Sequence, residues 1–277
     1  MNRTLVVSSV IVVLLLGVAG GGYYLWRSKT ARPAAVATAA AEPVPATPAP
    51  PADPPIHHPI ESMPTLPPGD AAPGGASDDG VKASLDDLLG SRAVLSFLQV
   101  DNFIGRIVAT VDNLDREHAT PRLWPTNPMA GRFSASRGDG SEVIAPDNPR
   151  RYKAFVDFVE AIDTPRAVAL YVKLYPRFQQ AYAALGYPRL YFNDRLVEVI
   201  DRLIAAPVPH GPVAVRLLAV KGPVASAQPW TRYEFVDPAL EALPAGQKMM
   251  VRVGPDNELR LKAKLLEFRR GLATGMR

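Results

Sequence analysis

The chain has 277 residues, 31 Lys and Arg against 27 Asp and Glu, and no cysteine. The lack of cysteine excludes disulfide bonds, thiol nucleophiles and thiolate metal sites. The small positive net charge does not indicate a nucleic-acid-binding protein, because the basic and aromatic residues are scattered along the chain rather than gathered in a stripe.

An apolar stretch, residues 5–26, carries no charged side chain and ends in Tyr23, Tyr24 and Trp26. About 20 apolar residues in a helix span the hydrocarbon core of a bilayer, and aromatic rings settle at its interface with water. We predict a single uncleaved transmembrane anchor, residues 1–29, in a bacterial inner membrane. The alternative is a cleaved signal peptide, which the lack of an Ala-x-Ala site disfavours.

The orientation of this anchor is read from its flanks. The N-terminal side carries Arg3, and the other side carries Arg27, Lys29 and Arg32, a count that leans towards a cytoplasmic C-terminus. The very short N-terminal tail and the spacer that follows the anchor favour the opposite orientation. We therefore expect a periplasmic body.

A proline-rich spacer follows the anchor. Residues 31–80 hold 13 of the 29 prolines of the chain, together with many alanines. Such a composition cannot bury enough apolar surface to offset the entropy cost of ordering. We predict a disordered Pro/Ala-rich linker over residues 30–80 and one globular domain over residues 81–277.

The body is expected to be α+β and mainly helical. Ser84, Asp101 or Asn102, and Asn193 have the side chains of helix N-caps, and Pro176 is expected to kink or split the helix that holds it. Apolar spacing predicts helices over 84–89, 92–100, 103–111, 146–162, 164–185, 191–204, 238–243, 245–252 and 255–272. Alternation and turn residues predict two small strand pairs, 132–136 with 142–145 and 213–220 with 230–236.

Three carboxylates on one predicted helix are the best catalytic candidates. Asp194, Glu198 and Asp201 recur at i, i+4 and i+7. A glycosidase needs two carboxyl groups roughly 5–10 Å apart across a sugar, which this spacing permits. Arg195 and Arg202 are interleaved with them, however, and an ion-paired helix face explains the pattern better.

Two clusters are candidate binding sites. Polar side chains gather where the helix over 191–204 begins, where an exposed helix N-terminus can bind an anion, and a small basic pair lies further on. The candidate binding residues are Tyr191, Asn193, Asp194, Arg195, Glu198, Lys248 and Arg252. We predict no catalytic set, cofactor or metal site, because His118 and His210 lie in loops without a partner base or enough neighbouring ligands.

Several phrases in the body are distinctive in combination. They are VATVDNL (108–114), PDNPRRY (146–152), LYPRFQQAYAALGYP (174–188), YFNDRLVEVID (191–201) and YEFVDPALEALPAGQKMMVRVGPDN (233–257). Over residues 84–272 the chain resembles the uncharacterised bacterial membrane-anchored proteins grouped as domain of unknown function number 3014. The resemblance implies a single anchor, a Pro/Ala spacer and one body domain, and it brings no activity, ligand or catalytic residue.

These observations favour a non-catalytic binding or scaffolding domain. We expect an inner-membrane protein that presents this domain to an envelope protein or a cell-wall component. The spacer would let the domain work away from the bilayer. The alternative is a cell-envelope hydrolase that acts on glycan or peptide through the paired carboxylates. A cytoplasmic scaffold is the third hypothesis, and it depends on the orientation of the anchor.

Overall fold

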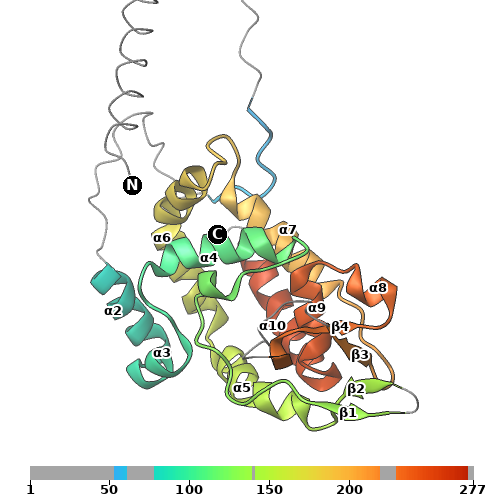
Figure 1. Cartoon of the computed structure of the whole chain (residues 1–277). Coiled ribbons are helices and arrows are strands. Elements are labelled where there is room, and N and C mark those ends of the chain that lie inside the picture. The colour runs from blue at the N-terminus through green and yellow to red at the C-terminus, as the bar shows by residue number, and fades with distance from the viewer. Residues whose placement is uncertain (1–52, 61–77, 139–140, 219–228, 274–277) are drawn as a thin grey trace, which may run out of the picture. The chain divides into compact units, whose positions relative to one another are not determined.

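The computed structural model describes residues 53–60, 78–138, 141–218 and 229–273 (Figure 1). The predicted anchor and most of the predicted spacer lie outside these ranges. Within them, no helix combines the length and the apolar character needed to cross a bilayer.

The described part of the body is mainly helical, as expected. Its α-helices are α2 (Asp78–Leu89), α3 (Ser91–Phe97), α4 (Phe103–Leu114), α5 (Lys153–Ala161), α6 (Thr164–Ala184), α7 (Phe192–Ile204), α8 (Pro238–Glu241), α9 (Ala245–Arg252) and α10 (Pro255–Ala273). Short 3₁₀ helices are η1 (Pro121–Leu123), η2 (Asn148–Tyr152) and η3 (Pro229–Thr231).

One predicted helix cap is wrong, and one of the two outcomes predicted for Pro176, a split helix, does not occur. Helix α2 begins at Asp78, so Ser84 is not its N-cap; the Ser84 hydroxyl instead donates to the Gly80 carbonyl inside the helix, at 2.9 Å. Acidic residues in the first turn favour this earlier start, because they complement the helix dipole. Helix α6 continues through Pro176 without splitting, and Tyr175 and Phe178 on either side of it are buried in the core.

The strands form one sheet rather than two separate pairs. The four strands, β1 (Ala135–Arg137), β2 (Glu142–Ile144), β3 (Ala214–Leu217) and β4 (Tyr233–Phe235), are antiparallel in the order β1-β2-β3-β4. Each predicted pair exists, and the added contact joins β2 to β3, with Val143 opposite Ala214. Val215 and Phe235 turn inward and pack with Val251 of α9, which fixes the register of the sheet.

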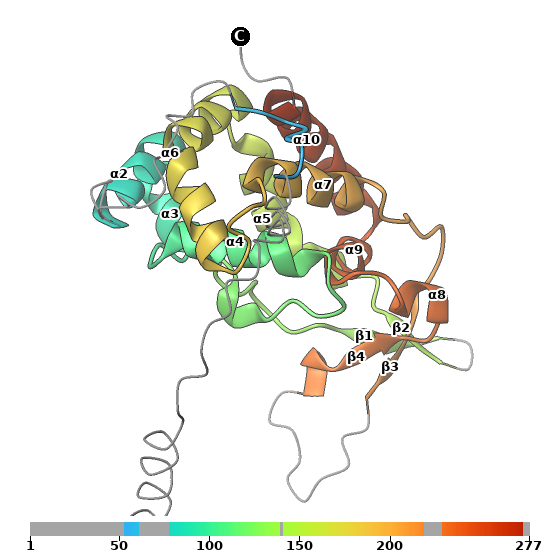
Figure 2. The same ribbon diagram turned by 90° about the horizontal axis from the view of Figure 1, so that it is seen from above.

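The main core lies between α4, α6 and α7, and α10 closes it from the other side (Figure 2). Its aromatic centre comes from α6 and α7, where Phe178 stacks on Phe192 at 5.8 Å between ring centroids. Burying each such ring contributes about 1.5–3 kcal/mol. The helices that carry the candidate site are therefore rigidly packed from behind.

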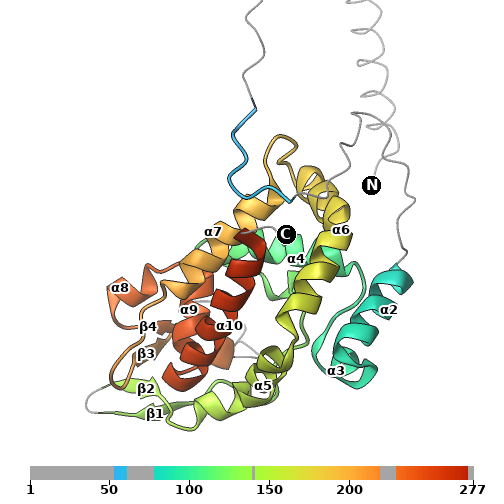
Figure 3. The same ribbon diagram turned by 180° about the vertical axis from the view of Figure 1, so that it is seen from behind.

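Two parts of the predicted spacer have a defined place in the fold: residues 53–60, and residues 78–80, which form the first turn of α2. Residues 53–60, which we call the strap, run beside the start of α7 (Figures 1 and 3) and bend at His57 and His58. The strap ends in Ile60, which is only 8% exposed and belongs to the main core cluster. The predicted disorder is therefore wrong for residues 53–60 and 78–80, and for the spacer residues outside the described ranges it stays a prediction.

Helix α9 packs so closely on α4 and α7 that a methyl group at Gly246 has no room. A Cβ there would lie 2.6 Å from the Leu203 Cδ2 atom and 3.1 Å from the backbone oxygen of Leu114. We expect Gly246→Ala to lower the free energy of unfolding by about 1–3 kcal/mol, although alanine is the better helix former. Urea denaturation measures this, with Gly211→Ala, where a Cβ meets nothing within 4 Å, as the control. A gain in stability at Gly246 would contradict this close packing.

Candidate functional site

Helix α7 turns one face to the core and one to a polar groove. Phe192, Val199 and Ile200 are buried. The opposite face borders a groove of about 1400 Å³, which is also lined by the strap, the 187–191 turn and the end of α4. The α7 residues in this groove are Asp194, Arg195, Val197, Glu198, Asp201 and Arg202.

The backbone donors at the start of α7 are already bound. The Phe192 amide donates to Gln179 Oε1 at 2.8 Å, and the Asn193 amide donates to the Tyr175 hydroxyl at 3.2 Å. Burial raises the pKa of Tyr175, so its hydroxyl stays neutral and also donates to Gln179. The Phe192 and Asn193 amides, which an anion at this helix start would need, are therefore both occupied by side chains of α6.

Asn193 is not the N-cap that we predicted, because the cap position is Tyr191 and no side chain caps the helix there. The Asn193 side chain is fully buried and joins three segments instead. Its Nδ2 donates to the His58 carbonyl at 2.8 Å and to the Leu272 carbonyl at 3.2 Å, and its Oδ1 accepts from the Tyr171 hydroxyl at 3.1 Å. Asn193 therefore connects the strap to α6, α7 and α10.

Asp194 binds the backbone of the strap. Its two carboxylate oxygens accept from successive amides, His57 N at 3.0 Å and His58 N at 2.6 Å. Successive N–H groups that point at one anion are a recognised backbone mode of anion binding. The Tyr191 hydroxyl accepts from the Ile60 amide at 3.0 Å. Three of the predicted binding residues, Tyr191, Asn193 and Asp194, thus hold one peptide segment.

Arg195 and Glu198 belong to an ion-pair network with the end of α4. Arg195 Nη1 lies 3.0 Å from Asp115 Oδ2 and 2.8 Å from Glu198 Oε2. Arg202 lies 2.8 Å from Asp115 and 3.0 Å from Glu198. Burial alone would raise the pKa of Glu198, but its hydrogen bonds to Arg195 and Arg202 outweigh this and lower the pKa.

This pairing gives the hydrolase hypothesis no support. A general acid needs a carboxyl group with a raised pKa, whereas that of Glu198 is lowered. Asp201 is held by Arg269 of α10, with a second contact of 2.9 Å. Asp194 is engaged by the strap. Across the described ranges, no three His, Asp or Glu side chains converge to hold a metal ion.

Lys248 and Arg252 lie on α9 and pack against the sheet region rather than lining the groove. Lys248 is 5% exposed and donates to Glu241 Oε1 at 2.9 Å. Arg252 donates to the Tyr233 carbonyl at 2.8 Å and lies over the Phe235 ring. Lys248 and Arg252 therefore join α9 to α8 and β4, and they do not share a site with Asp194.

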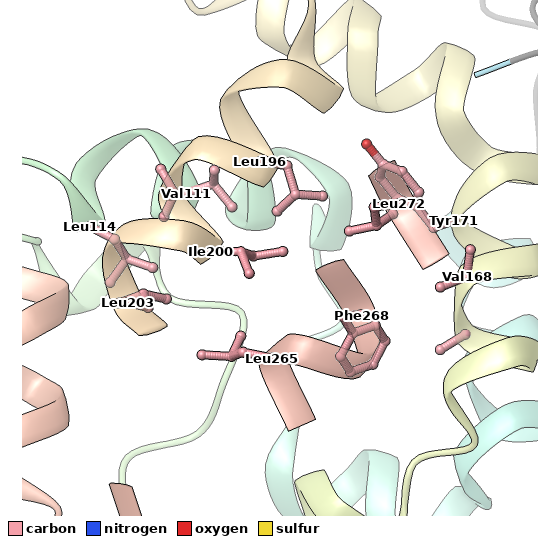
Figure 4. Close-up of a pocket in the computed structure, with 12 residues that line it drawn as sticks. Val111, Leu114, Val168, Tyr171, Leu196, Ile200, Leu203, Leu265, Phe268 and Leu272 are labelled. Atoms are coloured by element: carbon pink, nitrogen blue, oxygen red, sulfur yellow. The ribbon is translucent and has the colours of Figure 1, made fainter. Parts of the chain in front are cut away.

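A second, smaller hollow of about 280 Å³ lies between α4, α6, α7 and α10 (Figure 4). Its lining is Val111, Leu114, Ala167, Val168, Tyr171, Leu196, Val199, Ile200, Leu203, Leu265, Phe268 and Leu272. Figure 4 shows these side chains facing a common space. The Tyr171 hydroxyl is its polar group, and it is already bonded to Asn193. A ligand site needs a few polar groups that fix the orientation of the ligand. Because the Tyr171 hydroxyl is already bonded to Asn193, we place the candidate site in the groove.

Sequence reasoning missed the strap. The signal was present, because Ile56 and Ile60 are the only isoleucines in residues 31–80. It also missed Asp115, which ties the α7 arginines to α4. Both are contacts between segments far apart in the chain, which a local pattern does not reveal.

The Lys248–Glu241 pair gives stability a predictable pH dependence. Burial raises the pKa of Glu241, but its hydrogen bonds to Lys248 and to the Phe235 amide outweigh this and lower it. A lowered carboxyl pKa stabilises the fold above the unfolded value of about 4.3, and the contribution is lost as the pH falls through the folded-state pKa.

We therefore expect Glu241→Gln to lower the free energy of unfolding by about 2 kcal/mol at pH 7, because it leaves the buried Lys248 without its anion. This difference from wild type should shrink below about pH 4. Urea titrations across this pH range measure it, with Glu117→Gln, at a side chain 81% exposed, as the control. A difference that is constant with pH would refute the ionic role.

The family described as "Protein of unknown function (DUF3014)" matches residues 103–269, which run from the start of α4 into α10. The match includes every predicted binding residue and excludes the strap. Over residues 103–269 it confirms the family to which the sequence showed a resemblance. No curated protein and no solved structure matches the chain. The match covers more than half of the 277 residues. On this ground the chain belongs to the family of the protein of unknown function DUF3014.

Proposed function

We propose that the protein is a membrane-anchored, non-catalytic binding protein, and that the groove along α7 is its binding surface. The observation that carries this proposal is the strap itself. Asp194, Asn193 and Tyr191 hold a segment from a distant part of the chain through its backbone amides and a carbonyl. Such contacts are also those by which a groove can recognise the main chain of a separate polypeptide.

The charges of the groove support binding over catalysis. Arg195 and Glu198 are fixed in a network that reaches from α7 to α4, so their positions are set before any ligand arrives. Preorganised charges lower the entropy cost of binding, because their side chains are already ordered. Catalysis would need a carboxyl group free to exchange a proton, and each α7 carboxylate in the groove is engaged.

The rest of the proposal comes from the sequence. Residues 5–26 have the length and apolar character of a membrane anchor, and the short N-terminal tail favours a periplasmic body. A partner in the cell envelope, either a protein or a cell-wall component, follows from that placement. The spacer would let the domain reach beyond the lipid headgroups.

The placement can be tested with single cysteines, because the chain has none of its own. Ala83 is exposed on α2, so Ala83→Cys should react with a membrane-impermeant maleimide in intact cells. Asn2→Cys, on the other side of the predicted anchor, should react only after lysis and is the matched control. The opposite pattern would place the domain in the cytoplasm and overturn the envelope assignment.

The binding surface can be tested by site-specific photocrosslinking in living cells that make the full chain. Leu190 lines the groove and is 41% exposed, whereas Leu259 on α10 is 56% exposed and does not line it. A photoreactive phenylalanine analogue at Leu190 should join the protein to a second molecule, and the same analogue at Leu259 should not. Mass spectrometry then tells polypeptide adducts from glycan adducts.

Equal yields at Leu190 and Leu259 would mean that the groove has no special role in binding. A complete lack of adducts at Leu190, with the protein folded and inserted, would contradict a partner at this surface.

A further inference from the structure

The strap is held mainly through its main chain and through one buried side chain at its end, as a bound peptide is. Four of its residues, Asp53, His57, His58 and Ile60, contribute a polar or apolar anchor. Four main-chain hydrogen bonds join the strap to α7 side chains or to the residue before α7. Ile56 in the middle is 54% exposed. At the other end, Asp53 pairs with Arg189 at 2.9 Å in an exposed position, where an ion pair adds little stability.

The sequence of the strap fits the bonds that it makes. Within Asp-Pro-Pro-Ile-His-His-Pro-Ile, the prolines stand at positions 54, 55 and 59, where no amide is needed. The amides that donate belong to His57, His58 and Ile60. Among the described residues, neither imidazole makes a hydrogen bond or an ion pair. The groove therefore holds the strap through backbone N–H groups at fixed positions and through the buried Ile60 side chain.

On these grounds we propose that the α7 groove recognises a proline-containing polypeptide segment, and that the strap is an internal competitor that occupies the groove until such a segment displaces it. This inference rests on the proposed function. The segment must present two successive amides to Asp194, a carbonyl to Asn193, and an aliphatic side chain to the site filled by Ile60.

Competition within one chain has a measurable signature. A segment in the same chain competes at an effective concentration that is on the order of millimolar for short connections. The apparent affinity for an external peptide is then reduced by the fraction of molecules whose groove is empty. If the strap is docked in about nine of ten molecules, its release raises the apparent affinity about tenfold.

The release variant changes the strap and leaves the groove intact. His57→Pro and His58→Pro remove the two amides that bind Asp194, because proline has no N–H, and Ile60→Ala weakens the buried end. The matched control, His57→Ala with His58→Ala, keeps both amides and Ile60. Since the imidazoles make no polar contact among the described residues, this control should keep the strap docked.

The probe is a fluorescein-labelled peptide with the sequence of residues 53–60, and fluorescence anisotropy reports its binding to the full chain in detergent. We expect the release variant to bind this peptide at least ten times more tightly than wild type or the alanine control. The same peptide with proline in place of both histidines should bind none of the proteins. Hydrogen exchange of the amide at position 60, which both proteins retain and which binds Tyr191 in wild type, should be slower in wild type than in the release variant.

Two failures are distinguishable. Equally tight peptide binding to wild type and to the release variant would show a peptide site that the strap does not block, and the competitor inference would fall while the proposed function stands. If the peptide does not bind a folded release variant, the proposal that the groove binds a polypeptide is refuted. Wild-type protein that is dimeric by light scattering, and monomeric once the strap is released, would mean exchange between two copies and would also overturn an internal competitor.

Discussion

The fully buried amide of Asn193 is the constraint around which this end of the domain is arranged. Its side chain has four hydrogen-bonding positions, and three bonds hold α6, α10 and the strap to the first turn of α7. Leaving one such buried group without a partner costs about 1–3 kcal/mol. A segment that replaces the strap must therefore supply a carbonyl to Asn193, as His58 does.

The same helix carries a layer of charge on its other face. Asp112 is 4% exposed and lies beside Arg116 and Arg195. A half-buried network of this kind is rigid, because each guanidinium has a fixed fork of donors and each carboxylate meets two cations. The groove is thus a surface with a defined pattern of charge, and the buried amide beneath it fixes where that pattern meets the strap.

The sequence predicted the helices well, because each one has an apolar face at a spacing that only a helix aligns. It predicted both strand pairs, since each is a local hairpin or a short-range match, but not the contact between Val143 and Ala214 that merges them. Caps at Ser84 and Asn193 were wrong for one reason. Polar side chains suited to capping were used by other contacts, within α2 in the first case and across three segments in the second.

At the candidate site, the spacing of charged residues identified the face of α7 that borders the groove, but not the segments that this face contacts. Asp194 was selected for its neighbours on α7, yet what it binds comes from the strap, far away in the chain. Lys248 was selected as a surface cation, and its burial against Glu241 depends on how α8 and α9 meet. Charge spacing shows which residues share a face, whereas the identity of the opposing segment is a property of the whole fold.

The order of the strands has a consequence for the protein as it leaves the ribosome. The β1–β2 hairpin cannot complete its sheet until β3 has been made, because Val143 pairs with Ala214. The roughly 70 residues between them take on the order of 4–14 s to synthesise at ~5–20 residues per second. During that interval one edge of the hairpin lacks its partner strand, and α10, which packs on α5, α6 and α7, is still unmade. The nascent domain therefore passes through a stage with an unpaired strand edge, and such an edge is prone to aggregate unless a chaperone covers it.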